Sequence, residues 1–169
     1  MLILMAGLPG TGKSTIAREL AVQLDGTVLD KDQIRSALFA SRDIEYSTAQ
    51  DDFVMGVMLQ VARYIYERDS ARRIFIDGRP FAKRYQLDNV IASAKEMGAE
   101  WRILECVCSE ESARKRLESG SGEHPAANRT FELYEKMKAE FEPIILPKTV
   151  LDTDQPLVNC VHAALRAFA

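Results

Sequence analysis

Short apolar runs alternate along the chain with longer segments in which apolar residues recur every three or four positions. The runs predict strands at residues 2–6, 27–30, 73–77, 102–108 and 148–152. The longer segments predict helices over residues 13–24, 47–67, 83–97, 130–142 and 156–168. Strands that alternate with helices are typical of a parallel sheet covered by helices. The pattern therefore predicts an α/β fold.

The strand–helix alternation continues from one end of the sequence to the other. With 169 residues the chain has the length of one domain with a substantial core, so we expect a single domain over residues 1–169. The glycines, proline and small polar residues of 119–128 predict a mobile loop within that domain rather than a linker between two domains. Ser47, followed by Gln50, predicts a capping box at the start of the second long helix.

Composition narrows the class of protein and its partners. Apolar residues make up 47% of the chain and charged residues 28%, and the formal net charge of −3 offers no overall attraction for nucleic acid or for an anionic membrane. No apolar run approaches the roughly 18 residues of a membrane span, and residues 2–6 are too short for a signal peptide. Three cysteines, an odd number, indicate reduced thiols. We expect a cytoplasmic protein with no membrane partner.

Residues 7–15, G-L-P-G-T-G-K-S-T, match the pattern G-x-x-x-x-G-K-[ST] between a predicted strand and a predicted helix. Glycines let the backbone curl until successive N–H groups point at one anion, and the helix N-terminus adds partial positive charge. The lysine would reach the β- and γ-phosphates, and the serine hydroxyl would ligate Mg²⁺. A plain turn between strand and helix is the alternative. We expect ATP and Mg²⁺ to bind at Gly7, Pro9, Gly10, Thr11, Gly12, Lys13, Ser14 and Thr15.

The second predicted strand ends in D-K-D-Q-I-R, residues 30–35. In an open α/β sheet the ligand crevice lies at the carboxyl ends of the strands, so Asp30 and Asp32 are expected near the phosphates. A carboxylate there can accept a proton from an attacking hydroxyl, and an arginine can clamp an anionic acceptor. Arg35, three residues after Asp32, shares its helix face. The alternative is an aspartate that only caps a helix, with Arg35 on the surface.

The third predicted strand ends in R-I-F-I-D-G-R, residues 73–79. An acid that closes an apolar strand beside a phosphate-binding turn reaches the metal directly or through water, which is the role expected of Asp77. Gly78 lets a ligand approach the backbone, and Arg79 enters the same crevice, so we expect Asp77 and Arg79 to contact the substrate as well. The alternative is an aspartate in a frequent Asp-Gly turn.

A fourth segment predicts a lid at roughly 110–130. Arginines on a helix beside a glycine-containing loop suit a lid that closes over the transferring phosphate and excludes water. Arg114, Arg116 and Arg129 are the candidates to stabilise charge there. The alternative is a solvated charged helix with an i,i+4 pair between Glu110 and Arg114.

Together these segments resemble the small P-loop kinases that phosphorylate a hydroxyl: the adenylylsulfate, shikimate and gluconate kinases and the polynucleotide 5′-kinases. The chain is most similar to the zeta-toxin-like, AAA-type ATP-binding proteins near that group, and the resemblance runs from residue 7 to the closing T-V-L-D-T at 149–153. It implies a P-loop NTPase fold with a five-stranded parallel sheet of order 2-3-1-4-5, and ATP·Mg²⁺ as phosphate donor.

The same resemblance implies roles for individual residues. It implies that Asp32 is the base, Arg35 the anchor of the acceptor and Asp30 a neighbour of the metal, and that Asp77 is the acid after the third strand. Arg116 matches the first lid arginine of the family. Several relatives carry a second lid arginine four residues later, where this chain has Gly120, and Arg129 is the candidate to replace it. Residues 153–156 are implied to border the adenine.

We therefore expect an ATP-dependent phosphotransferase with a small hydroxyl metabolite as acceptor. The enzymatic alternative is a polynucleotide 5′-hydroxyl kinase, which would need an electropositive groove formed by Arg35, Arg42, Arg79, Lys83 and Arg84. The alternative from another class is a nucleotide-gated ATPase switch. The sequence contains no N-K-x-D segment for reading guanine and leaves no room for the helical second domain of such ATPases.

Overall fold

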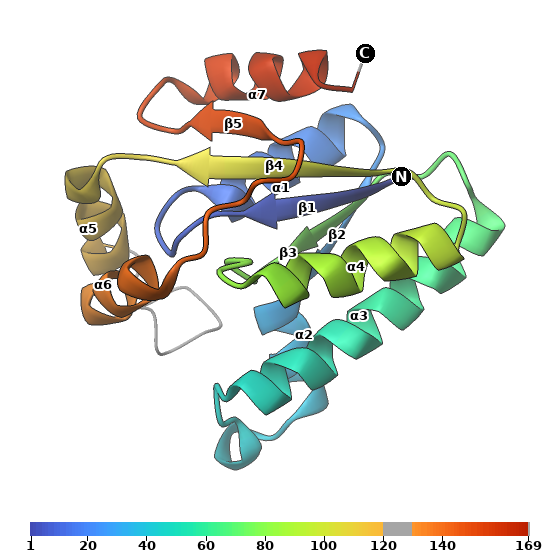
Figure 1. Ribbon diagram of the computed structural model, residues 1–169, viewed down its shortest axis with the longest axis horizontal. Helices are drawn as coiled ribbons and strands as arrows, with labels where there is room; N and C mark the ends of the chain where they lie inside the picture. Colours follow the sequence, from blue (N-terminus) through green and yellow to red (C-terminus); the bar gives the residue numbers. More distant parts are fainter. Residues whose placement is uncertain (120–129, 169) are drawn as a thin grey trace.

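The centre of the molecule is a five-stranded parallel sheet in the order β2-β3-β1-β4-β5. In the computed structural model, which describes residues 1–119 and 130–168, the strands are β1 (Leu2–Ala6), β2 (Thr27–Asp30), β3 (Ile74–Asp77), β4 (Trp101–Val107) and β5 (Thr149–Asp152). All five arrows in Figure 1 point the same way, so the carboxyl ends of the strands share one edge. The predicted α/β class and strand order are confirmed.

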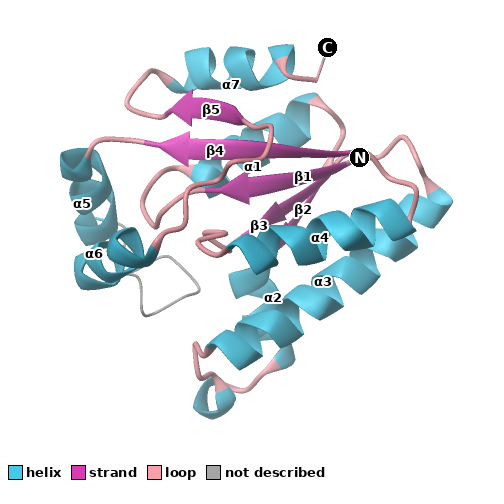
Figure 2. Cartoon of the chain, viewed as in Figure 1, coloured by secondary structure: helices cyan, strands magenta, loops and turns pink. Residues whose placement is uncertain are grey.

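Helices cover both faces of the sheet (Figure 2). The described helices are α1 (Lys13–Gln23), α2 (Lys31–Leu38), α3 (Thr48–Arg68), α4 (Arg84–Glu96), α5 (Glu110–Ser119), α6 (Phe131–Glu140) and α7 (Leu157–Arg166), with a 3₁₀ turn η1 (Ser41–Asp43). α1 and α7 pack on one face, and α3 and α4 on the other. None of the described helices combines the length and apolar character of a membrane span.

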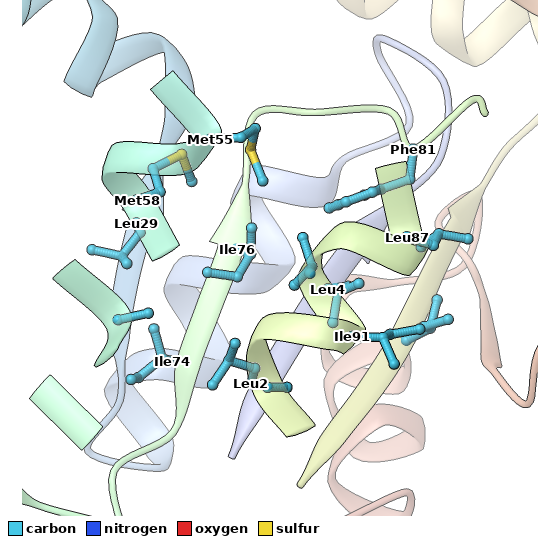
Figure 3. Close-up of a cluster of buried hydrophobic side chains, with 14 of the residues drawn as sticks. Leu2, Leu4, Leu29, Met55, Met58, Ile74, Ile76, Phe81, Leu87 and Ile91 are labelled. Atoms are coloured by element: carbon cyan, nitrogen blue, oxygen red, sulfur yellow. The ribbon is translucent and has the colours of Figure 1, made fainter. Parts of the chain in front are cut away.

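The central strand β1 is buried along its whole length because both of its faces are covered. Leu2 and Leu4 point into the cluster shared with α3 and α4, which Figure 3 shows, whereas Ile3 and Met5 pack with α1 and α7 on the opposite face. An uninterrupted apolar run is therefore what this position in the sheet requires. Directly after it, the chain enters the glycine-rich turn at the carboxyl edge.

Side-chain caps define where two of the helices start. Asp30 precedes α2 and accepts hydrogen bonds from the backbone of Asp32 at 2.9 Å and of Gln33 at 3.2 Å. Ser47 precedes α3 and accepts from the backbone of Gln50 at 3.1 Å. The predicted capping box at Ser47 is only half correct, because the Gln50 side-chain oxygen accepts from the Glu45 backbone N–H at 3.0 Å and not from that of Ser47, while its amide nitrogen donates to the Asp43 carbonyl at 2.8 Å. The Gln50 side chain therefore holds the loop before α3 in place and does not cap the Ser47 backbone N–H.

Candidate active site

The glycine-rich turn joins β1 to α1 at the carboxyl edge of the sheet (Figure 1). Gly7, Gly10 and Gly12 all have positive φ, at 128°, 78° and 82°. α1 begins at Lys13 with no side chain capping it, so its first N–H groups remain available to an anion. The residues predicted to hold the nucleotide are brought together in this turn and the first turn of α1: Gly7, Pro9, Gly10, Thr11, Gly12, Lys13, Ser14 and Thr15.

Close packing fixes the shape of this turn. A Cβ atom on Gly7 would lie 2.2 Å from the Cys106 carbonyl oxygen, so only glycine fits there. The Lys13 Nζ and the Thr11 hydroxyl both donate to the Leu8 carbonyl, each at 2.8 Å. The lysine head group is therefore folded over the turn, where a phosphate would lie.

A cavity of about 340 Å³ opens beside the turn. Its lining combines the glycine-rich turn, α1, α5 and the segment after β5, and includes Gly12, Thr15, Ile16, Arg116, Thr153 and Gln155. The predicted lid arginine and part of the segment predicted to border the adenine are thus brought to one cavity next to the turn.

Arg116 connects α5 to both walls of this cavity. Its Nη1 donates to the Thr153 hydroxyl at 3.0 Å and to the Gly10 carbonyl at 3.3 Å, and its Nη2 donates to the Thr153 carbonyl at 2.7 Å. The Thr153 hydroxyl in turn donates to the Thr11 carbonyl at 3.0 Å. The guanidinium therefore joins the phosphate-binding turn to the loop after β5.

The other arginines predicted for the lid are placed differently. Arg114 lies over the Phe131 ring, 3.6 Å from its centroid, and Glu110 pairs with Lys138 at 2.8 Å instead of with Arg114. These contacts hold α5 against α6 and leave Arg114 away from the cavity lining. Arg129, and the predicted loop at 119–128 apart from Ser119, lie outside the described residues.

Two carboxylates lie side by side where β2 and β3 end. Asp30 and Asp77 are register partners in these strands. The Oδ1 of Asp30 is engaged in capping α2, and its Oδ2 accepts from Gln33 at 3.4 Å. Asp77 is 0% exposed, and neither of its oxygens has a hydrogen-bond partner in the described structure. An unpartnered buried carboxylate is costly unless a ligand completes it, which makes Asp77 suited to a cation.

Asp32 lies at the centre of a buried ion-pair network with residues of α2 and α3. Its Oδ1 accepts from Arg35 at 2.8 Å and lies 3.8 Å from Lys31. Arg35 also pairs with Asp51 of α3, and Asp51 pairs with Lys31 at 2.8 Å. Burial, with a smaller contribution from the nearby Arg35 and Arg79, lowers the pKa of Lys31 to about 8 despite the opposing attraction of Asp32. The predicted shared face of Asp32 and Arg35 is confirmed.

Arg79 makes a second connection to the start of α3. It is buried, its Nη1 lies 2.6 Å from Asp52, and its Nη2 donates to the Tyr85 hydroxyl at 3.3 Å. Lys31, Asp51 and Asp52 were not predicted to belong to the site. Acidic residues in the first turn of a helix are ordinary, and no periodicity in the sequence indicates that this turn packs against α2.

The cations that would form a groove for a polynucleotide are each paired with a carboxylate. Besides Arg35 and Arg79, the pairs are Arg42 with Asp43 at 3.7 Å, Lys83 with Glu142 at 3.4 Å and Arg84 with Asp88 at 2.8 Å. The described surface therefore does not gather these residues into an unbalanced positive patch.

The cysteines serve packing. Cys106 is buried in the cluster under α1 and α7, and burial raises the pKa of its thiol to about 12. Cys108 follows the end of β4 and packs beside α5 with Leu117 and Tyr134. Within the described residues, no three His, Cys, Asp or Glu side chains are close enough to hold a metal ion unaided.

Comparison with known proteins finds one matching family and solved structures with the same fold over nearly the whole chain. The family model described as "AAA domain" matches residues 2–144. Gluconokinase from Sinorhizobium meliloti superposes with a TM-score of 0.66 at 18% identity, covering 98% of this chain and 89% of that one. Kti12 from Chaetomium thermophilum, crystallised with ADP-AlF3, gives 0.75 at 15% identity, covering 99% and 97%.

APS kinase from Mycobacterium tuberculosis, crystallised with AMPPNP and APS, gives a TM-score of 0.69 at 15% identity, covering 99% of this chain and 96% of that one. At such identities the likeness establishes the fold, and the predicted P-loop NTPase fold is confirmed. No curated protein matches the chain.

Proposed function

Because the chain belongs to the AAA domain family, whose model matches most of its length, we propose that it is an ATP-dependent phosphotransferase. It moves the γ-phosphate of ATP to a hydroxyl group of a small metabolite. The observation that carries the proposal is the state of Asp32. One of its oxygens is held by Arg35, and the other has no partner among the described residues, as a positioned general base requires.

In this proposal the donor nucleotide lies along the glycine-rich turn and the adjoining cavity. The backbone N–H groups of the turn and of the first turn of α1 bind the phosphates, with contacts from Gly7, Pro9, Gly10, Thr11, Gly12, Lys13, Ser14 and Thr15. Lys13 releases the Leu8 carbonyl and turns to the β- and γ-phosphates. Thr153 borders the nucleoside in the 340 Å³ cavity, and Arg116 lies where this cavity meets the phosphate-binding turn.

The residues at the strand ends fit a magnesium ion. Asp77 supplies an unpartnered buried carboxylate, Ser14 supplies a hydroxyl at the start of α1, and Asp30 lies beside Asp77. One or two carboxylates together with substrate phosphates are how proteins usually hold Mg²⁺, which agrees with the lack of an all-protein cluster in the described chain. When bound, the ion would neutralise charge on the phosphate oxygens.

Transfer then follows from the position of Asp32. Its free oxygen takes the proton of the acceptor hydroxyl, the hydroxyl oxygen attacks the γ-phosphorus, and the bond to the β-phosphate oxygen breaks to leave ADP. Arg35 holds the carboxylate in place, and together with Asp77 and Arg79 it lines the acceptor site. Lys13 and Arg116, with Arg129 as a further candidate, stabilise the negative charge on the transferring group.

The pairing of cations bears on the polynucleotide alternative. A carboxylate neutralises each cation of the predicted groove, which consists of Arg35, Arg42, Arg79, Lys83 and Arg84. These residues therefore do not form the electropositive surface that binding of a phosphate backbone requires, so a small metabolite is favoured as acceptor. A nucleotide-gated ATPase switch has no acceptor hydroxyl to deprotonate, so this alternative does not explain why Arg35 orients Asp32.

The test is transfer from labelled ATP·Mg²⁺ to fractions of a metabolite extract. Wild type should form a labelled product, and Asp32→Asn should abolish it while nucleotide binding persists. Asp88→Asn, a surface carboxylate paired with Arg84, is the matched control and should leave transfer intact. Full transfer by Asp32→Asn would refute the base assignment. Transfer to a 5′-hydroxyl oligonucleotide, or hydrolysis without any acceptor, would favour one of the alternatives.

A further inference from the structure

Near its start, α3 directs two consecutive carboxylates at two cations that come from different strand ends. Asp51 pairs with Arg35, which follows β2, and Asp52 pairs with Arg79, which follows β3. Both arginines belong to the proposed acceptor site. Any acceptor that reaches Asp32 must therefore meet the start of α3.

The cations of this site are already neutralised by the protein itself. The arginine side chains are only 2% and 4% exposed, and their terminal nitrogens are engaged: Arg35 with Asp32 and Asp51, and Arg79 with Asp52 and Tyr85. The Nε atoms of both arginines lack a partner in the described structure, but both are buried. Neither Arg35 nor Arg79 therefore presents an exposed donor to an anionic group.

Lys31 completes a network whose formal charges balance. Three cations, Lys31, Arg35 and Arg79, lie among three carboxylates, Asp32, Asp51 and Asp52. An anion could displace Asp51 from Arg35 only by leaving a mostly buried carboxylate without its partner, which is the costly way to break a buried ion pair.

The groups of this network that remain available to a ligand are carboxylate oxygens. The Oδ2 atoms of Asp32 and Asp52 have no hydrogen-bond partner among the residues described, and the Asp52 side chain is 41% exposed. An ionised carboxylate only accepts hydrogen bonds, so these oxygens suit hydroxyl donors and repel phosphate, sulfate or carboxylate groups.

We propose that Asp51 and Asp52 determine acceptor specificity by neutralising Arg35 and Arg79, so that the site selects an uncharged polyhydroxyl compound over an anionic one. This inference rests on the proposed function. The arginines position Asp32 and Asp52, and the hydroxyl groups of the acceptor donate to the free oxygens of these two carboxylates.

Sulfate is the probe that tests this arrangement, by calorimetric titration of protein loaded with AMPPNP and Mg²⁺ so that the phosphate-binding turn is occupied. Wild type should bind no sulfate at concentrations up to about 10 mM, a range chosen for weak single-ion affinities. Asp51→Asn with Asp52→Asn should bind it at least about 10-fold more tightly, and adding Arg79→Gln should remove the part of the gain that Arg79 supplies. Asp52→Asn alone, which frees only Arg79, serves if the double variant does not fold.

The surface variant Asp88→Asn frees the exposed Arg84 and is the matched control, with no gain expected. Sulfate binding by wild type that Arg79→Gln abolishes would overturn the inference, and so would the absence of any gain in the folded Asp52→Asn variant. Failure of the proposed function has a separate signature, which is the lack of AMPPNP binding or of transfer to any metabolite fraction.

Discussion

Asp77 lies directly beside Asp30 in the register of β3 and β2, yet only Asp30 has hydrogen-bond partners. Asp30 is committed to capping α2, whereas Asp77 is fully buried with both oxygens unpartnered in the described structure. A charge kept in this state is unfavourable for folding and useful only if a cation reaches it. The two neighbours therefore give different predictions.

Asp77→Asn should not lower the thermal midpoint of the metal-free protein, because it removes a buried carboxylate that has no hydrogen-bond partner among the described residues. It should abolish the extra stabilisation that Mg²⁺ gives to ATP-bound protein and slow transfer by about 100-fold, the loss expected when about 2.7 kcal/mol of charge stabilisation disappears. Thermal unfolding with ATP, with and without Mg²⁺, measures the first effect. A variant that keeps the full Mg²⁺-dependent shift would contradict the metal role of Asp77.

Asp30 should behave as a helix cap in stability measurements. Asp30→Ala removes the acceptor for two backbone N–H groups and should lower the free energy of unfolding by about 1 kcal/mol. Asp30→Asn retains a good capping side chain and should change it by less than about 0.5 kcal/mol. Urea unfolding compares the two, and equal losses in both variants would show that the charge, and not the cap, matters.

The strands, and the chemistry at their ends, were predictable from sequence because both depend on local pattern. Apolar runs gave all five strands to within one residue, and the rule that ligands bind at carboxyl ends brought Asp32 and Asp77 to one edge. The pairing of Asp51 with Arg35, 16 residues apart, was not predictable. It depends on how α3 packs against α2, and the sequence carries no local signal for that contact.

The cap at Asp30 illustrates a second limit. An aspartate at a strand end and at a helix start satisfies both the functional and the structural interpretation, and only the hydrogen bonds of Asp30 reveal that it caps. Ser47 and Gln50 gave the reverse case, in which the sequence matched a capping box but the Gln50 side-chain oxygen accepts from the Glu45 backbone and not from Ser47. When two hydrogen-bond partners are similar in energy, packing decides which of them the side chain takes.

Arg116→Ala should weaken ATP binding by about 10-fold. The variant loses three hydrogen bonds that tie α5 to Thr153 and to the Gly10 carbonyl, and charged donors of this kind contribute about 1.5–3 kcal/mol. Lys115→Ala is the matched control, since it removes a positive charge from the neighbouring exposed position of the same helix. Titration with a fluorescent ATP analogue measures both. Equal losses would assign the effect to general electrostatics.

The glycines of the turn should differ in their tolerance of a methyl group. Gly7→Ala forces its Cβ against the Cys106 carbonyl and should distort the turn, with a loss in the free energy of unfolding above about 2 kcal/mol. A Cβ on Gly12 would meet nothing closer than 3.6 Å, so Gly12→Ala should lower the free energy of unfolding only by the roughly 1–2 kcal/mol that a left-handed backbone conformation costs a residue other than glycine. Urea unfolding without nucleotide ranks them, and a larger loss for Gly12→Ala would contradict the packing.

The buried amine of Lys31 should make the stability of the protein depend on pH. Burial lowers the pKa of Lys31 to about 8 in the folded protein, from 10.5 in the unfolded chain. Between these two values the unfolded chain binds more protons than the folded protein, so the free energy of unfolding must rise with pH across that interval. Below about pH 8 both states hold the proton, and the contribution of Lys31 is constant.

Lys31→Met removes this titration, so the comparison of wild type with Lys31→Met isolates it from other groups that titrate in the same range. The stability of wild type relative to the variant should increase between pH 8 and 10.5 by up to about 3 kcal/mol, since each pKa unit corresponds to about 1.4 kcal/mol. The exposed Lys136→Met should show no such trend. A relative stability that stays flat or falls over this interval would mean that the ion pairs with Asp32 and Asp51 outweigh the burial of the amine.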